Sequence, residues 1–558
     1  MRIPRDILIP GILAVAFVTV AVTSAARKSP TCDEAAHHIP AGYVLLTKGD
    51  LAFSPETPPL ARYLAAVPLL FLDLKLPDDR AFWARDDRAE FSREFLYSLN
   101  RRLAGLSVFL ARLPMILVGA FGGVFLFAWV RKRYGALTAI FAGVFYFLSP
   151  NILAHARLAA TDITATVLIM CSVLLFRDIL TCRGYKEVFV AGIFLGLALL
   201  SKFSALLLLP FYFAVVCSDF VARTVFRKEK GPAAGIFLRF FVCLAVSFLV
   251  LWAGYAFEFK PLLVNVLRPE DKVEFFTAAI QRILPFAGGG FTDRCVRAFY
   301  TVPVPLSSYI MGLMGVLRHG AEGARTFFMG SWSRTGHPMY YILAFFVKTP
   351  IPVIVSFLFG IFIGMKDKEH RPFNLYLTGC ILLFFIVASR SDLQLGLRYI
   401  LPVYPFVFLI AAQGLKSLFQ GKKMFRIAGA ALVLWLAWTQ FFIWPDYLSY
   451  FNEIAGGPAK GYKYLRDSNI DWGQDLPALK DHMKKKGFGA VKLDYFGEGD
   501  PAWYGIDCEY ITETETRCPG GHVYAISVNH LERYDWAVHT RPDATAGHSI
   551  FIYDLRKK

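Results

Sequence analysis

Residues 31–62 read TCDEAAHHIPAGYVLLTKGDLAFSPETPPLAR, and this polar stretch follows directly on the first hydrophobic segment. It carries an acidic pair, Asp33 and Glu34, then two histidines, and a further acidic residue, Glu56, in a proline-rich segment. Long apolar runs make up much of the chain that follows. We therefore expect the rest of the chain to be a scaffold that positions this stretch.

The composition predicts a polytopic α-helical membrane protein. Of the 558 residues, 56% are hydrophobic and only 18% are charged, with a mean hydropathy of +0.45. Apolar runs that match the thickness of a bilayer core recur along the chain and predict about eleven transmembrane helices. The net charge of +17 is spread over short loops, as the positive-inside rule requires, and forms no stripe. Nucleic-acid binding is therefore not expected.

Two domains are expected. Residues 1–444 would form the membrane domain, with long outer loops at 27–101 and 257–340. Within the first loop, the broken apolar run at 59–76 predicts a helix that lies on the membrane surface. The polar tail at 445–558 is long enough for one small domain on the outer face.

The tail pattern predicts an α/β fold. A helix is expected near 473–487, and strands are expected near 490–495, 522–528 and 549–553. At the other end of the chain, the segment at 6–26 is either a cleaved signal peptide or a retained helix, and its length favours the retained helix.

The acidic pair has a structural and a functional interpretation. Thr31 and Glu34 fit a capping box, in which Glu34 reaches back to the start of a short helix. Asp33 and His37 are four residues apart and share a helix face, as do Glu34 and His38. A carboxylate beside a histidine at the membrane surface suits a general base or a metal ligand.

The segment Ser54-Pro55-Glu56-Thr57-Pro58-Pro59 is expected to be extended and stiff. Such a segment can hold one side chain in place, and Glu56 is that side chain. It can also be a plain loop rim. His37, His38 and Glu56 would permit a divalent metal ion without requiring one.

Four other places put ionisable residues near the predicted outer face. His155, Arg157 and Asp162 lie in one short turn. They are either membrane anchors or site residues that converge with the first loop. Lys202 lies at an outer hairpin, where it either snorkels or holds an anionic lipid head group. Guanidinium groups match phosphate bidentately, which makes two arginines of a later turn candidate phosphate ligands. These are Arg390 and Arg398, and His337 precedes a span near the same face.

The cysteines give no metal-binding spacing and no CxxC motif. Several lie within apolar runs and are expected to be small core residues. Cys508 and Cys518 lie in the polar tail. If that tail is extracytoplasmic, its surroundings would permit a disulfide between them.

Taken together, the motifs resemble bacterial polyprenyl-phosphate-sugar-dependent glycosyltransferases of family 39, in the GT-C membrane class. This class includes protein O-mannosyltransferases and the lipid A aminoarabinose transferase. The resemblance covers essentially the whole chain, and the order and spacing of the motifs carry it. The matching pieces are Asp33-Glu34, Glu56-Thr57-Pro58-Pro59, His155 through Asp162, Gly336-His337-Pro338 with Lys348-Thr349-Pro350, Gly396 through Pro405, and Leu448 through Asp475.

This resemblance implies roles for the residues. Asp33 would be the catalytic base, with Glu34 in support. Glu56 would stand where some relatives have a metal-associated carboxylate, and His37 and His155 would lie on the metal or acceptor side. Thr57 replaces the lysine of the aminoarabinose branch, which argues against that specificity. Lys202, Arg390 and Arg398 would hold the donor phosphate, supported by Arg157, Asp162 and His337.

The expected function is therefore transfer of a sugar, with inversion, from a polyprenyl-phosphate carrier to a hydroxyl of a protein, lipid A or another glycan. The expected location is the inner membrane, among membrane lipids, with the catalytic face and tail outside the cytoplasm. A lipid-linked-sugar transporter or flippase is the main alternative, but neither paired repeats nor charges near the midplane are evident. A non-catalytic membrane assembly protein is a further alternative.

Overall fold

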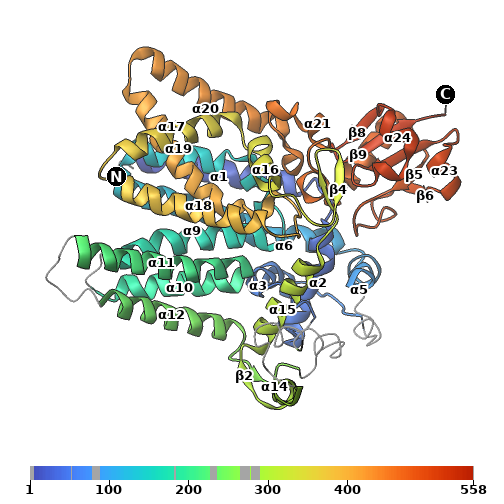
Figure 1. Cartoon of the computed structure of the whole chain (residues 1–558). Helices are drawn as coiled ribbons and strands as arrows, with labels where there is room; N and C mark the ends of the chain where they lie inside the picture. Colours follow the sequence, from blue (N-terminus) through green and yellow to red (C-terminus); the bar gives the residue numbers. More distant parts are fainter. Residues whose placement is uncertain are drawn as a thin grey trace.

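A computed structural model describes residues 5–51, 53–77, 88–180, 184–226, 235–263, 277 and 289–556. Its long helices lie side by side, and the C-terminal sheet covers one end of the bundle (Figure 1). We call this end the sheet end. The N-terminus lies at the opposite end, so that the first helix delivers the chain to the sheet end (Figure 1).

Seven helical segments of the described chain are long and apolar enough to cross a membrane. Their lengths and mean hydropathies match what a bilayer core requires. The helices that form these segments are α1 (Arg5–Ala25), α6 (Ala104–Tyr134), α11 (Leu208–Val221), α12 (Gly235–Gly254), α18 (Arg371–Ser389), α19 (Tyr404–Gln420) and α20 (Lys423–Ile443).

Two further segments are bent pairs of helices. α7 (Ala136–Phe147) and α8 (Pro150–Ala156) meet at 58°, and α16 (Tyr340–Lys348) and α17 (Ile351–Lys366) meet at 113°. A proline lies at each break, Pro150 or Pro350, and proline lacks the N–H that would continue a helix. Each pair is therefore broken at its proline and does not form one straight helix.

If each bent pair counts as one span, the described chain has up to nine candidate spans. The bundle is completed by α9 (Thr161–Ile179) and α10 (Lys186–Ser201), which pack against each other, while α9 also contacts α6 and α10 contacts α12. The count of about eleven spans stays a prediction. The predicted class, a polytopic helical membrane protein with a small α/β region after it, is confirmed.

The predicted first loop holds short helices at the sheet end. The expected surface helix at 59–76 is present as α3 (Leu60–Ala66) with η2 (Val67–Phe71), and Phe71 at its end is 86% exposed. The other elements of this loop are η1 (Glu34–His38), α2 (Ile39–Lys48), α5 (Arg88–Arg93) and η3 (Glu94–Leu99). Residues 78–87 of this loop lie outside the described residues.

The second predicted loop also contains short elements, although 264–276 and 278–288 lie outside the described residues. β1 pairs with β2, and β3 pairs with β4, both in antiparallel fashion. The elements are β1 (Phe259–Lys260), α14 (Gly289–Thr301), β2 (Val304–Pro305), α15 (Ser307–Glu322), β3 (Thr326–Phe328) and β4 (Ser331–Ser333).

The tail contains the predicted α/β fold. A five-stranded sheet has the order β6-β5-β7-β9-β8, with β5 parallel to both β6 and β7 and the remaining pairs antiparallel. Leu476, Leu479 and Met483 of the covering helix α22 share an apolar core with the sheet. The main elements are α22 (Leu476–Lys486), β5 (Ala490–Asp494), β6 (Asp507–Tyr510), α23 (Glu513–Arg517), β7 (Val523–Ser527), α24 (Asp535–His539), β8 (Ala544–Ala546) and β9 (Ile550–Asp554).

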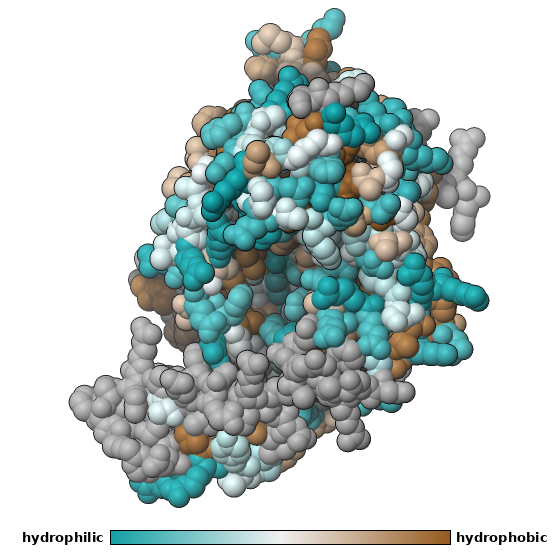
Figure 2. Space-filling view, turned by 90° about the vertical axis from the view of Figure 1, so that its right-hand side faces the viewer, coloured by the Kyte–Doolittle hydropathy of each residue, from teal (hydrophilic) through white to brown (hydrophobic). Residues whose placement is uncertain are grey.

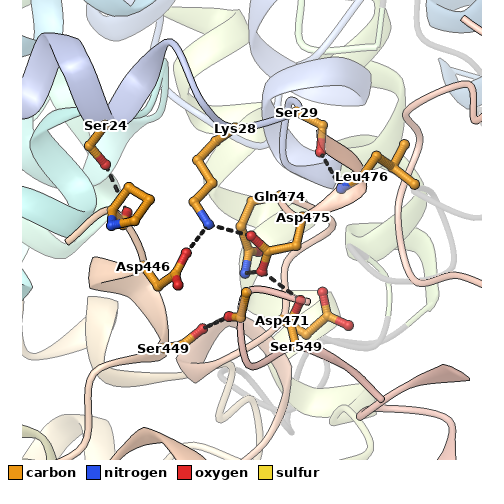
Figure 3. A network of polar contacts seen from close by, with 12 residues as sticks. Ser24, Lys28, Ser29, Asp446, Ser449, Asp471, Gln474, Asp475, Leu476 and Ser549 are labelled. Atoms are coloured by element: carbon orange, nitrogen blue, oxygen red, sulfur yellow. Dashed lines mark hydrogen bonds and ion pairs between the residues drawn. The ribbon is translucent and has the colours of Figure 1, made fainter. Parts of the chain in front are cut away.

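The segment 445–475 joins the bundle to the sheet and is largely buried. Lys28, three residues after the end of α1, lies between the carboxylates of Asp446 and Asp475 (Figure 3). On the bundle side, Lys348 donates a hydrogen bond to the Leu448 carbonyl at 2.8 Å. The division between 1–444 and 445–558 stays a prediction, and these contacts tie the two parts closely together.

Candidate functional site

An ion pair between Asp33 and Arg398 forms the centre of the candidate site. Arg398 Nη1 lies 2.6 Å from Asp33 Oδ2, and Arg398 Nε donates to the Leu395 carbonyl at 3.1 Å. The guanidinium also lies over the Trp472 ring, 4.3 Å from its centroid. The carboxylate, the backbone carbonyl and the indole together fix the orientation of Arg398.

The electrostatic surroundings keep Asp33 ionised. Burial would raise the pKa of Asp33, but the charges of Arg398, His37 and His38 outweigh burial and lower that pKa below its usual range. His38 contributes little positive charge at neutral pH, because burial lowers its own pKa to about 4. Arg398 is therefore the main partner that keeps Asp33 an anion.

A second ion pair lies nearby, between Asp162 at the start of α9 and Lys202 just after α10. Lys202 Nζ lies 2.6 Å from Asp162 Oδ1 and 5.0 Å from the Tyr399 ring centroid. His155 Nδ1 lies 3.5 Å from the other carboxylate oxygen. The two ion pairs influence each other: burial would lower the pKa of Arg398, but Asp33 and Asp162 together raise it.

The sheet end is hollowed in its middle (Figure 2). Hydrophilic residues gather above the hollow and at its sides, and hydrophobic residues are also visible within it (Figure 2). The ion-paired side chains keep some access to solvent, with 27% of the Asp33 side chain, 13% of Arg398 and 19% of Lys202 exposed, whereas Asp162 is only 2% exposed. The cationic groups are therefore available to a ligand, while Asp162 stays behind Lys202.

Glu34 occupies a different environment from Asp33. Its carboxylate is fully buried and accepts hydrogen bonds from Arg112 Nε and Nη2, both at 2.8 Å, and from the Ala159 N–H at 2.8 Å. The predicted capping-box contacts with Thr31 are also present. This geometry favours the structural interpretation, in which Glu34 holds the backbone beside Asp33.

Glu56 is bound by an arginine that the sequence pattern did not single out. Arg88 Nη1 and Nη2 lie 2.8 Å and 2.7 Å from the two carboxylate oxygens, and Nη1 also lies 3.2 Å from His37 Nδ1. Burial would raise the pKa of Glu56, but Arg88 outweighs burial and lowers it. Within the described residues, no group of three or more histidine, cysteine and acidic side chains is placed to hold a metal ion.

The remaining predicted residues lie at varied distances from this centre. Arg157 is completely buried, and its guanidinium nitrogens have no hydrogen-bond partner among the described residues. His337 stacks on Phe328 at 4.7 Å, and its backbone is hydrogen-bonded to Gln394 in the turn that leads to Arg398. Arg390 is exposed, and the structure does not bring it to either ion pair. Its predicted phosphate contact stays a prediction.

The joining segment completes the site from the C-terminal side. The Cys32 N–H donates to the Trp472 carbonyl at 2.9 Å, and Ser29 Oγ donates to the Gly473 carbonyl at 2.9 Å. The backbone before Asp33 is thus attached to the segment that places the Trp472 ring on Arg398. Cys508 and Cys518, in the sheet region, are both free thiols in this structure.

Sequence reasoning missed Arg88, Arg112, Lys28 and the pairing of Trp472 with Arg398. Each acts across a long separation in sequence, so helical or strand periodicity carries no signal for it. A weak signal existed for Lys28 and Arg112, because a charge within or directly beside a transmembrane segment needs a partner.

The fold and this cluster define a multi-pass membrane protein with a charged, partly accessible site at the sheet end of its bundle. Residues 93–261 match the model of the family described as dolichyl-phosphate-mannose-protein mannosyltransferase. No curated protein sequence matches the chain.

Three solved structures resemble the chain in fold. ArnT from Cupriavidus metallidurans bound to undecaprenyl phosphate is 12% identical, covers 97% of both chains and has a TM-score of 0.47. The apo oligosaccharyltransferase of Archaeoglobus fulgidus is 14% identical, covers 79% of this chain and 54% of its own, and has a TM-score of 0.46. The archaeal oligosaccharyltransferase AglB from Archaeoglobus fulgidus, in complex with an inhibitory peptide and a dolichol-phosphate, is 12% identical over 84% of this chain and 58% of its own, with a TM-score of 0.44.

Proposed function

We propose that the protein is a membrane glycosyltransferase of the GT-C class. It would move a sugar from a polyprenyl-phosphate carrier to a hydroxyl acceptor. The observation that carries this proposal is the convergence of one ionised carboxylate, Asp33, with two partly accessible cations, Lys202 and Arg398. The match of residues 93–261 to a mannosyltransferase family supports the same class of reaction.

The two cations suit the donor phosphate. A polyprenyl-phosphate sugar releases a phosphate monoester, and fixed positive charges stabilise the negative charge that grows on the leaving oxygen. Lys202 has three N–H donors and Arg398 has five, so each can bind phosphate oxygens in addition to its present carboxylate partner. In this proposal, the donor phosphate binds between Lys202 and Arg398.

The carboxylate suits the acceptor. Asp33 accepts the proton of the acceptor hydroxyl while the oxygen attacks the anomeric carbon and the bond to the phosphate breaks. One displacement of this kind inverts the anomeric configuration and needs no covalent enzyme intermediate. Donor phosphate bound to Arg398 competes with Asp33 for the guanidinium, which makes the carboxylate a stronger base at the moment when the donor is present.

The charge distribution supports an extracytoplasmic site in a cell inner membrane. Arg131, Lys132 and Arg133 lie in the last turn of α6, at the end of the bundle opposite the sheet, and Lys366 lies at the matching end of α17. By the positive-inside rule, basic residues at helix ends face the cytoplasm. The sheet end would then be outside, and polyprenyl lipids would reach the site from the surrounding membrane.

The test is sugar transfer in membranes that contain wild-type protein or the Asp33→Asn variant, with labelled polyprenyl-phosphate sugars as donors. The wild type should transfer label to an acceptor, and the variant should be slower by about 10²–10⁴-fold. Asn is nearly isosteric with Asp and accepts one hydrogen bond from Arg398, so insertion and folding should be retained. Equal transfer by both proteins would show that Asp33 is not the catalytic base. If a well-folded wild type transfers no sugar from any donor, the protein is not a glycosyltransferase.

A further inference from the structure

We infer that Arg88 takes the place of a divalent metal ion at Glu56, so that its guanidinium supplies the positive charge there and the site works without a metal. A carboxylate of this kind, with His37 close by, is where the sequence would permit a divalent ion without requiring one. The part of this inference that concerns catalysis depends on the proposed glycosyltransferase function. The part that concerns metal binding does not.

The geometry leaves no free ligand atom for a metal on the side of Glu56 that faces Arg88. The guanidinium makes a two-pronged contact, with Nη1 2.8 Å from Oε2 and Nη2 2.7 Å from Oε1. This fork-to-fork arrangement is among the strongest that a carboxylate forms with a side chain. A metal ion would have to displace Arg88 to reach both oxygens.

His37 is engaged by the same guanidinium. Arg88 Nη1 lies 3.2 Å from His37 Nδ1, and arginine only donates, so Nδ1 must be the accepting nitrogen. The lone pair that would bind a metal is therefore used. A neutral His37 then carries its proton on Nε2, which makes that nitrogen a donor and not a ligand.

Nearby charge also disfavours a divalent ion. Arg62 is buried, donates from Nη2 to the Thr57 carbonyl at 2.7 Å, and lies within electrostatic reach of Glu56 and of Arg88. It fixes the backbone next to Glu56 and adds a second positive charge to this region. A divalent ion placed beside Glu56 would be repelled by both arginines, although solvent at the 42% exposed Glu56 side chain weakens this repulsion.

The experiment compares metal content and transfer in the full chain, purified in lipid nanodiscs. The wild type should contain far less than one equivalent of any divalent metal by mass spectrometry. After EDTA treatment, its transfer rate should change by less than about twofold, because the enzyme would have no metal that generates a nucleophile or polarises the donor. A full equivalent of bound metal, with transfer lost in EDTA and restored by Mn²⁺ or Zn²⁺, would overturn the inference.

The Arg88→Ala variant provides the second test. Removing the guanidinium frees Glu56 and His37, so Mn²⁺ affinity measured by calorimetry should rise at least about tenfold over the wild type. Transfer should fall about tenfold or more and recover in part with added guanidinium ion. The control is Arg93→Ala, on the same short helix. Arg93 is 58% exposed and its long, 3.9 Å ion pair with Glu498 is weak, so this variant should change neither measurement.

The Glu56→Gln/Arg88→Ala double variant should lose the gained Mn²⁺ affinity, because the carboxylate that binds the ion is gone. If Arg88→Ala does not fold, Arg88→Lys keeps a positive charge and should stay insensitive to EDTA. Unchanged Mn²⁺ affinity in a folded Arg88→Ala protein would overturn the inference. If the wild type transfers no sugar, the proposed function fails, and metal content and Mn²⁺ binding still decide whether Arg88 occupies a metal site.

Discussion

Arg398 Nη1 lies 2.6 Å from Asp33 Oδ2, although the two residues are 365 positions apart in the chain. This ion pair joins the first loop to a 3₁₀ turn that precedes α19. It also places the proposed base and a proposed phosphate ligand in direct contact, so the charge of Arg398 keeps Asp33 ionised.

The first prediction concerns the pH dependence of transfer. Because the pKa of Asp33 is lowered, Asp33 should stay ionised throughout pH 5–8, and its protonation should slow transfer only in more acidic solution. In Arg398→Gln the carboxylate loses its main cation while burial remains, so the acidic limb should move up by about 1–3 pH units. Single-turnover rates across pH measure this limb. An unmoved limb would show that Asp33 titration does not control transfer.

The sign of the matching stability effect follows from the same shift. Since the pKa of Asp33 is lower in the folded protein than in the unfolded chain, the ion pair stabilises the protein above the unfolded-state pKa. That stabilisation is lost as the pH falls through the folded-state pKa. The melting temperature of Asp33→Asn should therefore fall less on acidification than that of the wild type.

A second prediction concerns Lys202. Replacing it with glutamine removes a cation at the proposed phosphate position and leaves Asp162 with the weaker contact to His155. We expect the KM for the donor to rise. The fall in kcat/KM should correspond to a loss of about 1.5–3 kcal/mol of transition-state stabilisation. The matched control is Lys48→Gln, which replaces an exposed lysine at the end of α2. A higher KM for the acceptor alone would contradict the assignment of Lys202 to the donor.

The third prediction tests the buried contact in Figure 3. Lys28→Met leaves Asp446 and Asp475 together without their shared cation, and breaking a buried ion pair in this way costs about 3–5 kcal/mol. Unfolding in denaturant should show this loss of stability. Arg27→Met, at the neighbouring exposed position, should cost less than about 1 kcal/mol. Similar losses in the two variants would mean that the Lys28 contacts add little.

A fourth prediction concerns Asp471, which is buried beside Ser527. Burial raises the pKa of Asp471 to about 8 from its ordinary value of 3.8. A carboxyl group with a raised pKa favours the folded protein at low pH, where it is protonated. This stabilisation is lost as the pH rises towards the pKa of the group in the folded protein. Asp471→Asn, which mimics the protonated acid, should therefore flatten the decline in melting temperature between pH 4 and 8. A decline as steep as in the wild type would exclude Asp471 as its source.

The sequence predicted the common location of the site residues better than their pairings. Chain direction alternates with each span, so the order of the spans alone assigns Asp33, Asp162, Lys202 and Arg398 to one end of the bundle. Which acid meets which base depends on how the helices pack. Arg390 and Arg398 looked equivalent in sequence, yet only Arg398 lies in the 3₁₀ turn that brings its side chain to Asp33.

Two other elements show what sequence patterns can and cannot predict. The α/β tail was predictable because apolar runs and a helical stretch specify strands and a helix locally. The break between α16 and α17 was not recognised, although Thr349-Pro350 marks it, because both halves are apolar and together have the length of one span. Likewise, the capping contacts of Glu34 were predictable, but its burial against Arg112 was not.

The attachment of Cys32 and Lys28 to the segment around Trp472 and Asp475 has a consequence for how the protein is made. The ribosome produces Asp33 early, but the residues that hold its loop and cover Arg398 come only after the last membrane helix. Until then Lys28 is a cation without its partners, and the nascent chain has an incomplete site. Chains that end before this segment would therefore lack the contacts that position Lys28 and Arg398.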